Sequence, residues 1–496
     1  MAAFYYLLIT FIGTEVLGRG LQPDKSENQL FLSKRVVTDS GEIDGGVLVN
    51  ENGIIEGIFT RDTIDKLFNG YDKNLQVIDG GDWALMAGVV DSHVHVNEPG
   101  RTSWEGFVTA TRAGAAGGIT TIVDMPLNSV PPTTSIENLK TKVSAAKEEV
   151  YVDVAFWGGL VPGNEEELQK LVKAGVVGFK GFLIDSGVSE FPNVEGDDLD
   201  KIFTTLNGSD IAVAFHAELP ISDGNNSSLC DKCENLDPVL YSTYLSSRPP
   251  QMEIDAATLL AKYIAKYDVH VHVVHVSAEG VIPILEKARE FRIQNGSKRW
   301  RGGVTAETCH HYLTLSSEQI PPGRTEYKCS PPIRDINNKL RLWEYIKQRR
   351  IDLIASDHSP SVAGLKSPNF MTAWGGVSSV QFGLSLFWTE AKARGYSLST
   401  VSHFLSSGPA RLAGLHDKKG ALKPGLDADL VFFDPDASFV LTPDKIFYKN
   451  KLSPYMYKVL TGKVMQTYVR GRLVFNDGQV YGNPQGKLLI NEDELY

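Results

Sequence analysis

Short apolar segments rich in β-branched residues alternate with longer segments of mixed polarity through the middle of the chain. In the longer segments, apolar residues recur at the helical spacing of three to four. This alternation is typical of β–α units around a parallel sheet. Helices are predicted at residues 103–116, 135–149, 165–174, 255–267 and 279–291. Strands are predicted at residues 88–96, 119–125, 152–160, 176–183, 211–218, 269–276, 304–313 and 351–356.

Eight strand–helix units within about 330 residues indicate an α/β fold, a (β/α)8 TIM-like barrel that we place at residues 85–420. Outside this region the pattern changes to short strands separated by turns. We expect the two flanks, residues 21–84 and 421–496, to pair into one small β-sandwich domain.

Residues that can bind a metal stand at the ends of the predicted strands. His93 and His95 close the first strand and, being two residues apart, share one face. Four further candidates close later strands, namely Lys180, His216, His275 and Asp357. In a barrel of this type the C-terminal strand ends meet at one mouth, where catalysis takes place. The sequence therefore predicts a buried metal centre with hydrolytic chemistry.

Six candidate ligands are too many for one tetrahedral zinc ion and suit two divalent ions. Imidazole and carboxylate favour zinc, with manganese, iron or cobalt as alternatives. Such ions activate water and polarise a carbonyl group. A desolvated Lys180 beside two cations is a neutral amine, which can add carbon dioxide to give a metal-bridging carbamate. Asp357 is the natural general base, because it can hold the water and pass its proton to a leaving nitrogen.

The sixth predicted strand offers two histidines, His272 and His275. Their odd separation places them on opposite faces of a strand. We assign His275 to the metal because it is nearer the strand end, and expect His272 to pack outward or against a helix. His310 and His311 are expected to be structural or to lie behind the ligands, and His358 and His403 are expected to be structural.

The cysteines do not form a metal site in this interpretation. Cys230 and Cys233 form one C-x-x-C pair, and a local disulfide or two loop thiols are expected because no second pair exists. Cys309 and Cys329 are expected in the core or the pocket wall. The chain carries 49 basic and 60 acidic residues, a net charge of −11, which favours a small-molecule substrate over nucleic acid.

The N-terminal residues 1–20 are a candidate signal or anchor segment. Residues 2–12 are apolar but too few for a confident membrane span, and no basic residue precedes them. We expect entry into the endoplasmic reticulum or secretory pathway. The alternatives are a first strand or a disordered tail, with a cytoplasmic location.

Several motifs together resemble the allantoinases, a family of cyclic amidohydrolases in the amidohydrolase superfamily. The resemblance runs in the family's order from about residue 41 to residue 476. The motifs are HVHVNEPGRTSWEGF at residues 93–107, MPLNS at 125–129, GFKGF at 178–182, HVS at 275–277, CSPPIR at 329–334, SDHSP at 356–360 and WGG at 374–376.

The resemblance implies a ligand assignment and a reaction. The more buried metal would be held by His93, His95, carboxylated Lys180 and Asp357. The second metal would share Lys180 and add His216 and His275. The implied reaction is hydrolysis of the hydantoin ring of allantoin to allantoate, in purine catabolism and ureide nitrogen recycling.

The resemblance also implies substrate contacts and an assembly. Main-chain groups next to Ser330 would bind the imide of the ring, and Asn97 and Asn128 would be polar pocket contacts. A homotetramer is expected from the family.

Two other interpretations are kept. Dihydropyrimidinase or hydantoinase activity is the alternative enzyme, whereas dihydroorotases carry arginine in place of Asn97. A catalytically inactive, dihydropyrimidinase-like scaffold protein is the alternative of a different class. Such scaffolds have lost metal ligands, and this chain keeps all six candidates.

Overall fold

The structure is a computed structural model that describes residues 28–67, 75–221 and 235–495. The candidate signal segment and the pair Cys230 and Cys233 lie outside the described residues. Among the described residues, no helix has both the length and the apolar character needed to cross a membrane.

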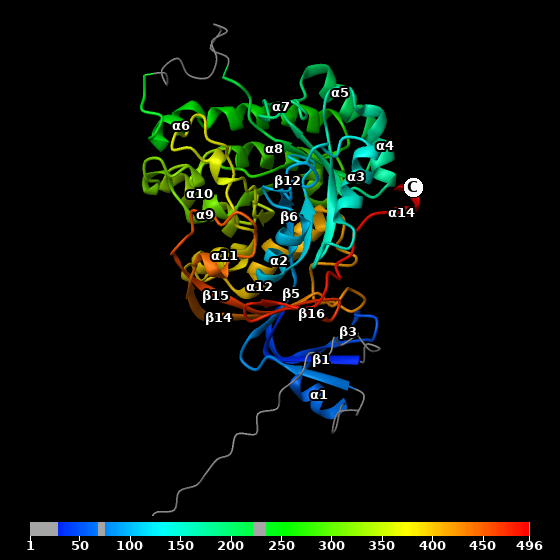
Figure 1. Cartoon of the computed structure of the whole chain (residues 1–496). Coiled ribbons are helices and arrows are strands. Elements are labelled where there is room, and N and C mark those ends of the chain that lie inside the picture. The colour runs from blue at the N-terminus through cyan, green and yellow to red at the C-terminus, as the bar shows by residue number, and fades with distance from the viewer. Residues whose placement is uncertain (1–27, 68–74, 222–234, 496) are drawn as a thin grey trace, which may run out of the picture.

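Eight parallel strands form the predicted barrel, in the order in which they follow one another along the chain. The first and last strands approach each other where the His95 N–H donates to the His358 carbonyl oxygen at 2.8 Å. The barrel is therefore nearly closed (Figure 1). Its strands are β6 (Val89–Val94), β7 (Ile119–Asp124), β8 (Asp153–Gly159), β9 (Gly178–Phe182), β10 (Ala212–His216), β11 (His270–Val273), β12 (Val304–Cys309) and β13 (Leu353–Ala355).

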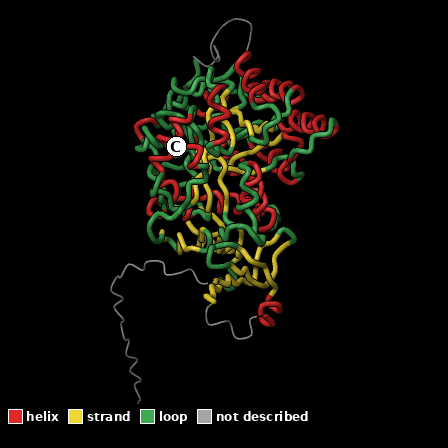
Figure 2. The backbone as a smooth tube through the Cα atoms, turned by 90° about the vertical axis from the view of Figure 1, so that its right-hand side faces the viewer, coloured by secondary structure: helices red, strands yellow, loops and turns green. Residues whose placement is uncertain are grey.

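Helices surround these strands, as Figure 2 shows by colour. Their apolar faces pack on the sheet and share one large core with it. The helices that follow the strands are α2 (Phe107–Ala116), α3 (Ile136–Ala146), α4 (Glu165–Lys173), α5 (Gly196–Thr205), α6 (Tyr241–Ser247), α7 (Gln251–Lys266), α8 (Val281–Gln294), α9 (His310–Thr314), α10 (Ile336–Lys347), α11 (Gly383–Ala393), α12 (Leu398–Ser402) and α13 (Gly408–Leu412).

All eight predicted strands are confirmed, with shorter ends than predicted. The strand predicted at residues 304–313 is wrong beyond Cys309, because His310–Thr314 is helix α9. Its apolar residues Tyr312 and Leu313 are buried. A short buried helix and a buried strand have the same apolar pattern, so the sequence alone did not separate them.

The two flanks of the chain combine into one mostly antiparallel sheet of nine strands. In Figure 1 the N-terminal strands lie lowest, and the C-terminal strands lie between them and the barrel. The sheet contains β1 (Asn28–Thr38), β2 (Gly41–Val49), β3 (Ile55–Thr60), β4 (Leu75–Asp79), β5 (Ala84–Ala87), β14 (Leu430–Val440), β15 (Val459–Val469), β16 (Arg472–Asn476) and β17 (Gln479–Val480). Helix α1 (Arg61–Leu67) follows β3.

Strand β5 joins the two flanks, because it pairs with β1 on one side and with β14 on the other. Side chains from both flanks share a separate core, which includes Phe31, Leu85, Phe432 and Tyr468. The predicted pairing of the two flanks is therefore confirmed, and it gives one mostly antiparallel sheet.

A buried ion cluster ties the barrel to the sheet. Asp153, at the start of β8, lies with its carboxylate 2.5 Å from Lys419 Nζ and also pairs with Arg470. Lys419 is within 2.7 Å of Asp427 and 2.9 Å of Asp429. Burial alone would lower the pKa of Lys419, but the three carboxylates raise it. A buried lysine and an arginine therefore pair with the acidic trio.

Replacing Lys419 with Met is expected to destabilise the fold by about 3–5 kcal/mol, because the buried Asp153 and Asp429 carboxylates lose the cation that they share. Urea unfolding followed by circular dichroism measures this change. Lys423→Met is the matched control, since Lys423 forms a largely exposed pair with Asp39 and its loss is expected to cost less than about 1 kcal/mol. Equal midpoints for the two variants would contradict the assigned role of the cluster.

The last part of the chain returns to the barrel. The Val154 N–H donates to Lys487 O at 2.9 Å, and the Leu489 N–H donates to Val154 O at 2.8 Å. Farther on, the Asn491 N–H donates to Ala174 O at 2.9 Å, just before α14 (Glu492–Leu495). The C-terminal segment therefore pairs with the start of β8, and Figure 1 shows it at the side of the barrel.

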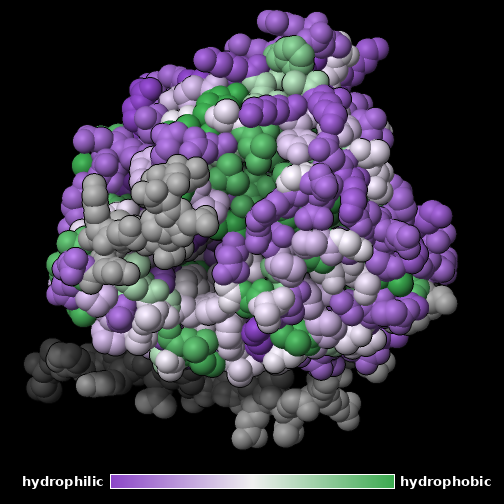
Figure 3. Space-filling view, turned by 90° about the horizontal axis from the view of Figure 1, so that it is seen from above, coloured by the Kyte–Doolittle hydropathy of each residue, from purple (hydrophilic) through white to green (hydrophobic). Residues whose placement is uncertain are grey.

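Figure 3, a view from above Figure 1, shows hydrophilic side chains over most of that face and a band of apolar side chains near its centre.

Candidate active site

Three of the predicted ligands meet where β6 and β13 end. His93 Nε2 lies 3.2 Å from Asp357 Oδ1, and His95 Nε2 lies 3.5 Å from the same oxygen. One potential ligand atom from each residue lies within 4.8 Å of the other two. All three side chains are buried. This group has the composition and spacing of a metal site.

The other three candidates lie beside this group. The ring centroid of His275 is 5.5 Å from that of His93 and 4.6 Å from that of His216. Lys180, in β9, lines the same cavity of about 400 Å³. The cavity opens at the C-terminal ends of the barrel strands, and its wall includes five predicted ligands, namely His95, Lys180, His216, His275 and Asp357.

Several buried polar atoms in this group have no hydrogen-bond partner among the described residues. They include His93 Nε2 and His275 Nδ1. Leaving such atoms without a partner costs about 1–3 kcal/mol each, so buried polar atoms are normally satisfied. Imidazole and carboxylate donors with free lone pairs fit divalent ions such as Zn²⁺. The residues present therefore fit a centre of two divalent metal ions.

Lys180 is an unusual lysine because it is 1% exposed and its ammonium group has no salt-bridge or hydrogen-bond partner among the described residues. Burial lowers its pKa to about 8, although Asp357 and Glu307 act in the opposite direction. Its Nζ lies 5.0 Å from the Phe182 ring. About half of such side chains are neutral amines at pH 8, which is the form that reacts with carbon dioxide.

Asp357 is held as a carboxylate. Burial alone would raise its pKa, but His93, His95 and His275 hold the pKa of Asp357 well below its usual value. The backbone of Asp357 (φ 43°) and that of His275 (φ 38°) is left-handed, which is uncommon for residues other than glycine. Such strain is typical of functional positions, where surrounding structure fixes the side chain.

Glu307, in β12, supports His93 and was not predicted. Its Oε1 lies 2.5 Å from His93 Nδ1, and its Oε2 lies 3.2 Å from His272 Nε2. Burial would raise the pKa of Glu307, but His93 and His272 lower it to about 2. Glu307 is therefore an anion that accepts hydrogen bonds from both rings.

The prediction that His272 packs outward or against a helix is wrong. His272 is fully buried and lies 3.2 Å from Glu307, behind the candidate ligand His93. The strand β11 ends at Val273, and the left-handed backbone at His275 breaks the alternation that the prediction extended to that residue. Two histidines at odd separation therefore both face inward.

His216 has a corresponding support in Glu218. His216 Nε2 lies 2.6 Å from Glu218 Oε2, so its Nδ1 is the nitrogen available to a metal. Arg248 donates to Glu218 from Nε at 3.1 Å and from Nη2 at 2.9 Å. The His216 ring stacks on Phe182 with centroids 4.7 Å apart. The i, i+2 spacing of His216 and Glu218 was a sequence signal for this pair.

The predicted substrate contacts divide into two groups. Ser330 and Asn128 line the cavity. The Ser330 hydroxyl lies 2.7 Å from the hydroxyl of Tyr244, another residue of the cavity wall. Asn97 is absent from the described cavity wall, and its amide donates to Pro360 O at 3.3 Å.

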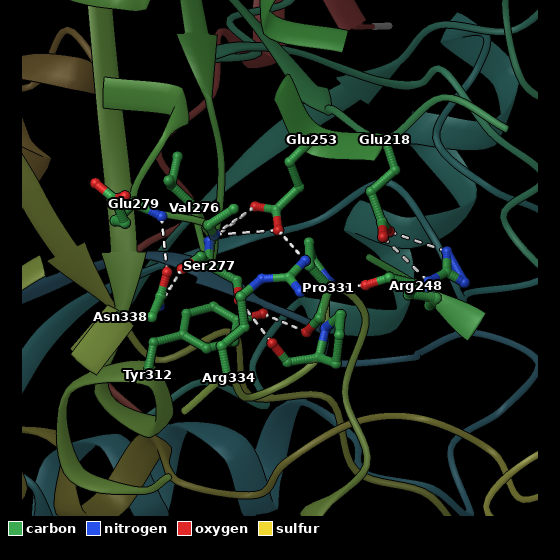
Figure 4. Close-up of polar contacts among 12 residues, drawn as sticks. Glu218, Arg248, Glu253, Val276, Ser277, Glu279, Tyr312, Pro331, Arg334 and Asn338 are labelled. Carbon is green, nitrogen blue, oxygen red and sulfur yellow. Dashed lines mark hydrogen bonds and ion pairs between the residues drawn. The ribbon is translucent and has the colours of Figure 1, made fainter. Parts of the chain in front are cut away.

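A polar network fixes the segment that carries Ser330, as Figure 4 shows. Glu253 accepts hydrogen bonds from the Ser277 N–H at 2.9 Å and from Arg334 Nη2 at 2.7 Å. The Tyr312 hydroxyl donates to Pro331 O at 2.7 Å. The HVS and CSPPIR motifs are thereby held together, which fixes Ser330 in the cavity wall relative to His275.

The remaining histidines and cysteines take places around the centre. His358 Nε2 lies 3.2 Å from Glu105 Oε2. His311 is buried near Cys309 and Asp357. Cys329 lines the cavity wall. His403, bonded to Ser407 at 3.4 Å, lies away from the cavity.

Comparisons with known proteins agree with this geometry. The model of the amidohydrolase family matches residues 84–474. The mitochondrial allantoinase of Aquarana catesbeiana is 51% identical over 351 residues, which cover 70% of this chain and 69% of that protein. The allantoinase of Streptomyces avermitilis is 41% identical over 468 residues, which cover 94% of this chain and 100% of that protein.

Solved structures show the same architecture. The L-hydantoinase (dihydropyrimidinase) from Arthrobacter aurescens superimposes with a TM-score of 0.84 at 27% identity, covering 94% of this chain and 100% of that chain. The family model spans well over half of the sequence, and the Streptomyces relative is matched over its whole length. The chain therefore belongs to the amidohydrolase family and, within it, to the allantoinases.

Proposed function

We propose that the protein hydrolyses the cyclic amide bond of allantoin to give allantoate, in purine catabolism and ureide nitrogen recycling. The observation that carries the proposal is the meeting of six metal-binding side chains at one barrel mouth, in a chain 41–51% identical to allantoinases. All six candidate positions are kept, so an inactive scaffold is not favoured.

The proposed ligands fall into two sets. His93, His95, Lys180 and Asp357 would hold the more buried ion, and Lys180, His216 and His275 would hold the second. Zinc is the first choice, with manganese or cobalt as alternatives. Bound divalent ions supply an activated water and polarise the scissile carbonyl group.

The protein's own groups supply the proton transfers and the orientation. Asp357, an anion at the cavity wall, is placed to accept a proton from the attacking water and to give it to the leaving ring nitrogen. Ser330 and Asn128 face the same cavity and would orient the ring through polar contacts. Asn97 would support the pocket indirectly, because its amide donates a hydrogen bond to Pro360 O in the neighbouring loop.

The test is an assay of purified, zinc-loaded protein with allantoin, hydantoin, dihydrouracil and dihydroorotate. We expect allantoate as the main product and the highest kcat/KM for allantoin. A preference for dihydrouracil or hydantoin would move the assignment to dihydropyrimidinase or hydantoinase. A lack of metal-dependent activity on every ring would instead favour the scaffold.

Carboxylation of Lys180 is expected to depend on pH in the metal-free protein. Only the neutral amine adds carbon dioxide, and the Lys180 pKa of about 8 means that the amine fraction rises as pH rises through 8. At a fixed concentration of dissolved carbon dioxide, the rate of reactivation by zinc should increase from pH 6.5 to 8 and level off above about pH 9. A rate that is independent of pH and of carbon dioxide would contradict carboxylation.

We infer a homotetramer from the family resemblance. Size-exclusion chromatography with light scattering of the purified chain, whose calculated mass is 54.5 kDa, tests the assembly. A mass near that of one chain or of two chains would overturn the inference.

We also propose entry into the endoplasmic reticulum or secretory pathway, on the ground of the apolar residues 2–12. A reporter fused after residue 30 tests this proposal, since a fusion that stays in the cytosol would leave a cytoplasmic location instead.

A further inference from the structure

A column of buried polar side chains runs through the inside of the barrel below the candidate metal centre. His270 Nε2 lies 2.8 Å from Thr305 Oγ1, and the same oxygen lies 2.9 Å from His272 Nδ1. His272 then contacts Glu307, and Glu307 contacts His93. Strands β11 and β12 carry the column, because their register places His272 beside Thr305.

The contacts of the column form one continuous hydrogen-bonded path from His270 to His93. Glu307 is a carboxylate and accepts only, so His93 Nδ1 and His272 Nε2 both donate to it. On the other side of the His272 ring, Nδ1 lies 2.9 Å from Thr305 Oγ1, whose hydroxyl can donate to it. The Thr305 oxygen in turn accepts from His270 Nε2. Each member thereby fixes the tautomer of the next.

The position of the proton matters at His93. When Nδ1 carries the proton, Nε2 has a free lone pair, and His93 Nε2 is the buried atom without a partner that lies 3.2 Å from Asp357 Oδ1. If Nε2 carried the proton instead, this nitrogen could not bind a metal. The column therefore bears on which nitrogen of His93 is free to bind a metal.

We propose that His270, Thr305 and His272 are positioning residues that set, through Glu307, the tautomer and orientation of His93 for the more buried metal. The proposal rests on the proposed binuclear function and extends it to three residues outside the ligand set. His270 is 8% exposed and lines a separate cavity of about 600 Å³ with Arg299 and Trp300. The column thus begins at a second cavity, whose described wall contains none of the six proposed ligands.

The experiment compares Thr305→Val with Thr305→Ser in the full-length protein. Valine keeps the shape and removes the hydroxyl, whereas serine keeps the hydroxyl. Zinc affinity is measured by competition with a chromophoric chelator, and zinc content by mass spectrometry. We expect a zinc dissociation constant for the tighter ion that is about tenfold weaker in Thr305→Val and 10–100-fold weaker in His272→Ala. Thr305→Ser should lie within about threefold of wild type.

The readouts separate positioning from loss of stability. Activity of Thr305→Val should fall at limiting zinc and return at saturating zinc, because the ligands themselves are intact. His310→Gln is the control, since His310 is a buried histidine outside the column. Equal zinc affinity in wild type and a folded Thr305→Val would overturn the proposal, as would an equal loss in His310→Gln. A wild-type protein that binds no zinc would instead show that the proposed function itself fails.

Discussion

Asp357→Asn is expected to lower kcat for allantoin hydrolysis by about a thousandfold or more, which corresponds to ~4 kcal/mol of barrier. Asparagine is nearly the same size but neutral, so it can neither accept the proton of the attacking water nor balance the charge of a metal ion. The surrounding His93 and His95 hold Asp357 as an anion in the wild-type protein. The measurement is a steady-state assay at saturating zinc, together with zinc content.

The zinc content separates two causes of this loss. The second ion, with its proposed ligands Lys180, His216 and His275, should remain bound in Asp357→Asn. The exposed Asp82→Asn serves as a control for the charge change, because Asp82 pairs only with the exposed Lys34 among the described residues. An Asp357→Asn variant that keeps kcat within tenfold of wild type would exclude Asp357 as the general base.

Lys180→Ala is expected to lose one or both zinc ions and to lower activity by at least about a thousandfold. The alanine leaves space at the cavity wall, where a small carboxylic acid can place two oxygens as the carbamate would. Addition of acetate or propionate should therefore restore part of the activity and of the zinc content. Lys180→Arg should not be restored, since its side chain fills the space and does not form a carbamate.

Lys328→Ala is a matched control for this experiment. Lys328 lines the same cavity, and burial lowers its pKa to about 8, as for Lys180. Its ammonium donates to the Ala373 carbonyl oxygen at 2.6 Å, so it has a structural partner that Lys180 does not have among the described residues. We expect Lys328→Ala to keep its zinc. Equal zinc loss in the two variants would contradict a ligand role for Lys180.

The barrel could be predicted because its strands are short apolar segments, and candidate ligands stand at the ends of five predicted strands. A single architecture places all eight C-terminal strand ends at one mouth, so His93 and Asp357 could be expected together although 263 residues lie between them. The small domain could be predicted only as a pairing of the flanks. Its nine-strand order depends on long-range contacts, such as that of β5 with β14, which leave no local pattern.

The supporting residues were harder to predict for the same reason. Glu307 and Arg334 are ordinary charged residues in the sequence, and their roles arise from contacts with His93 and Glu253. His272 was misplaced because strand alternation was extended past the real strand end at Val273. The sequence therefore indicates what binds the metal, and the structure adds what holds those ligands.

The position of β5 has a consequence for synthesis of the chain on the ribosome. Strand β5 is completed at Ala87, but its partner β14 begins only at Leu430. At 5–20 residues per second, the ribosome needs roughly 20–70 s to make the intervening chain. During that time the apolar edge of β5 has no partner from its own chain and can pair with another nascent chain. Slower elongation past residue 87 should therefore increase aggregation of the nascent protein, whereas early association with a chaperone should reduce it.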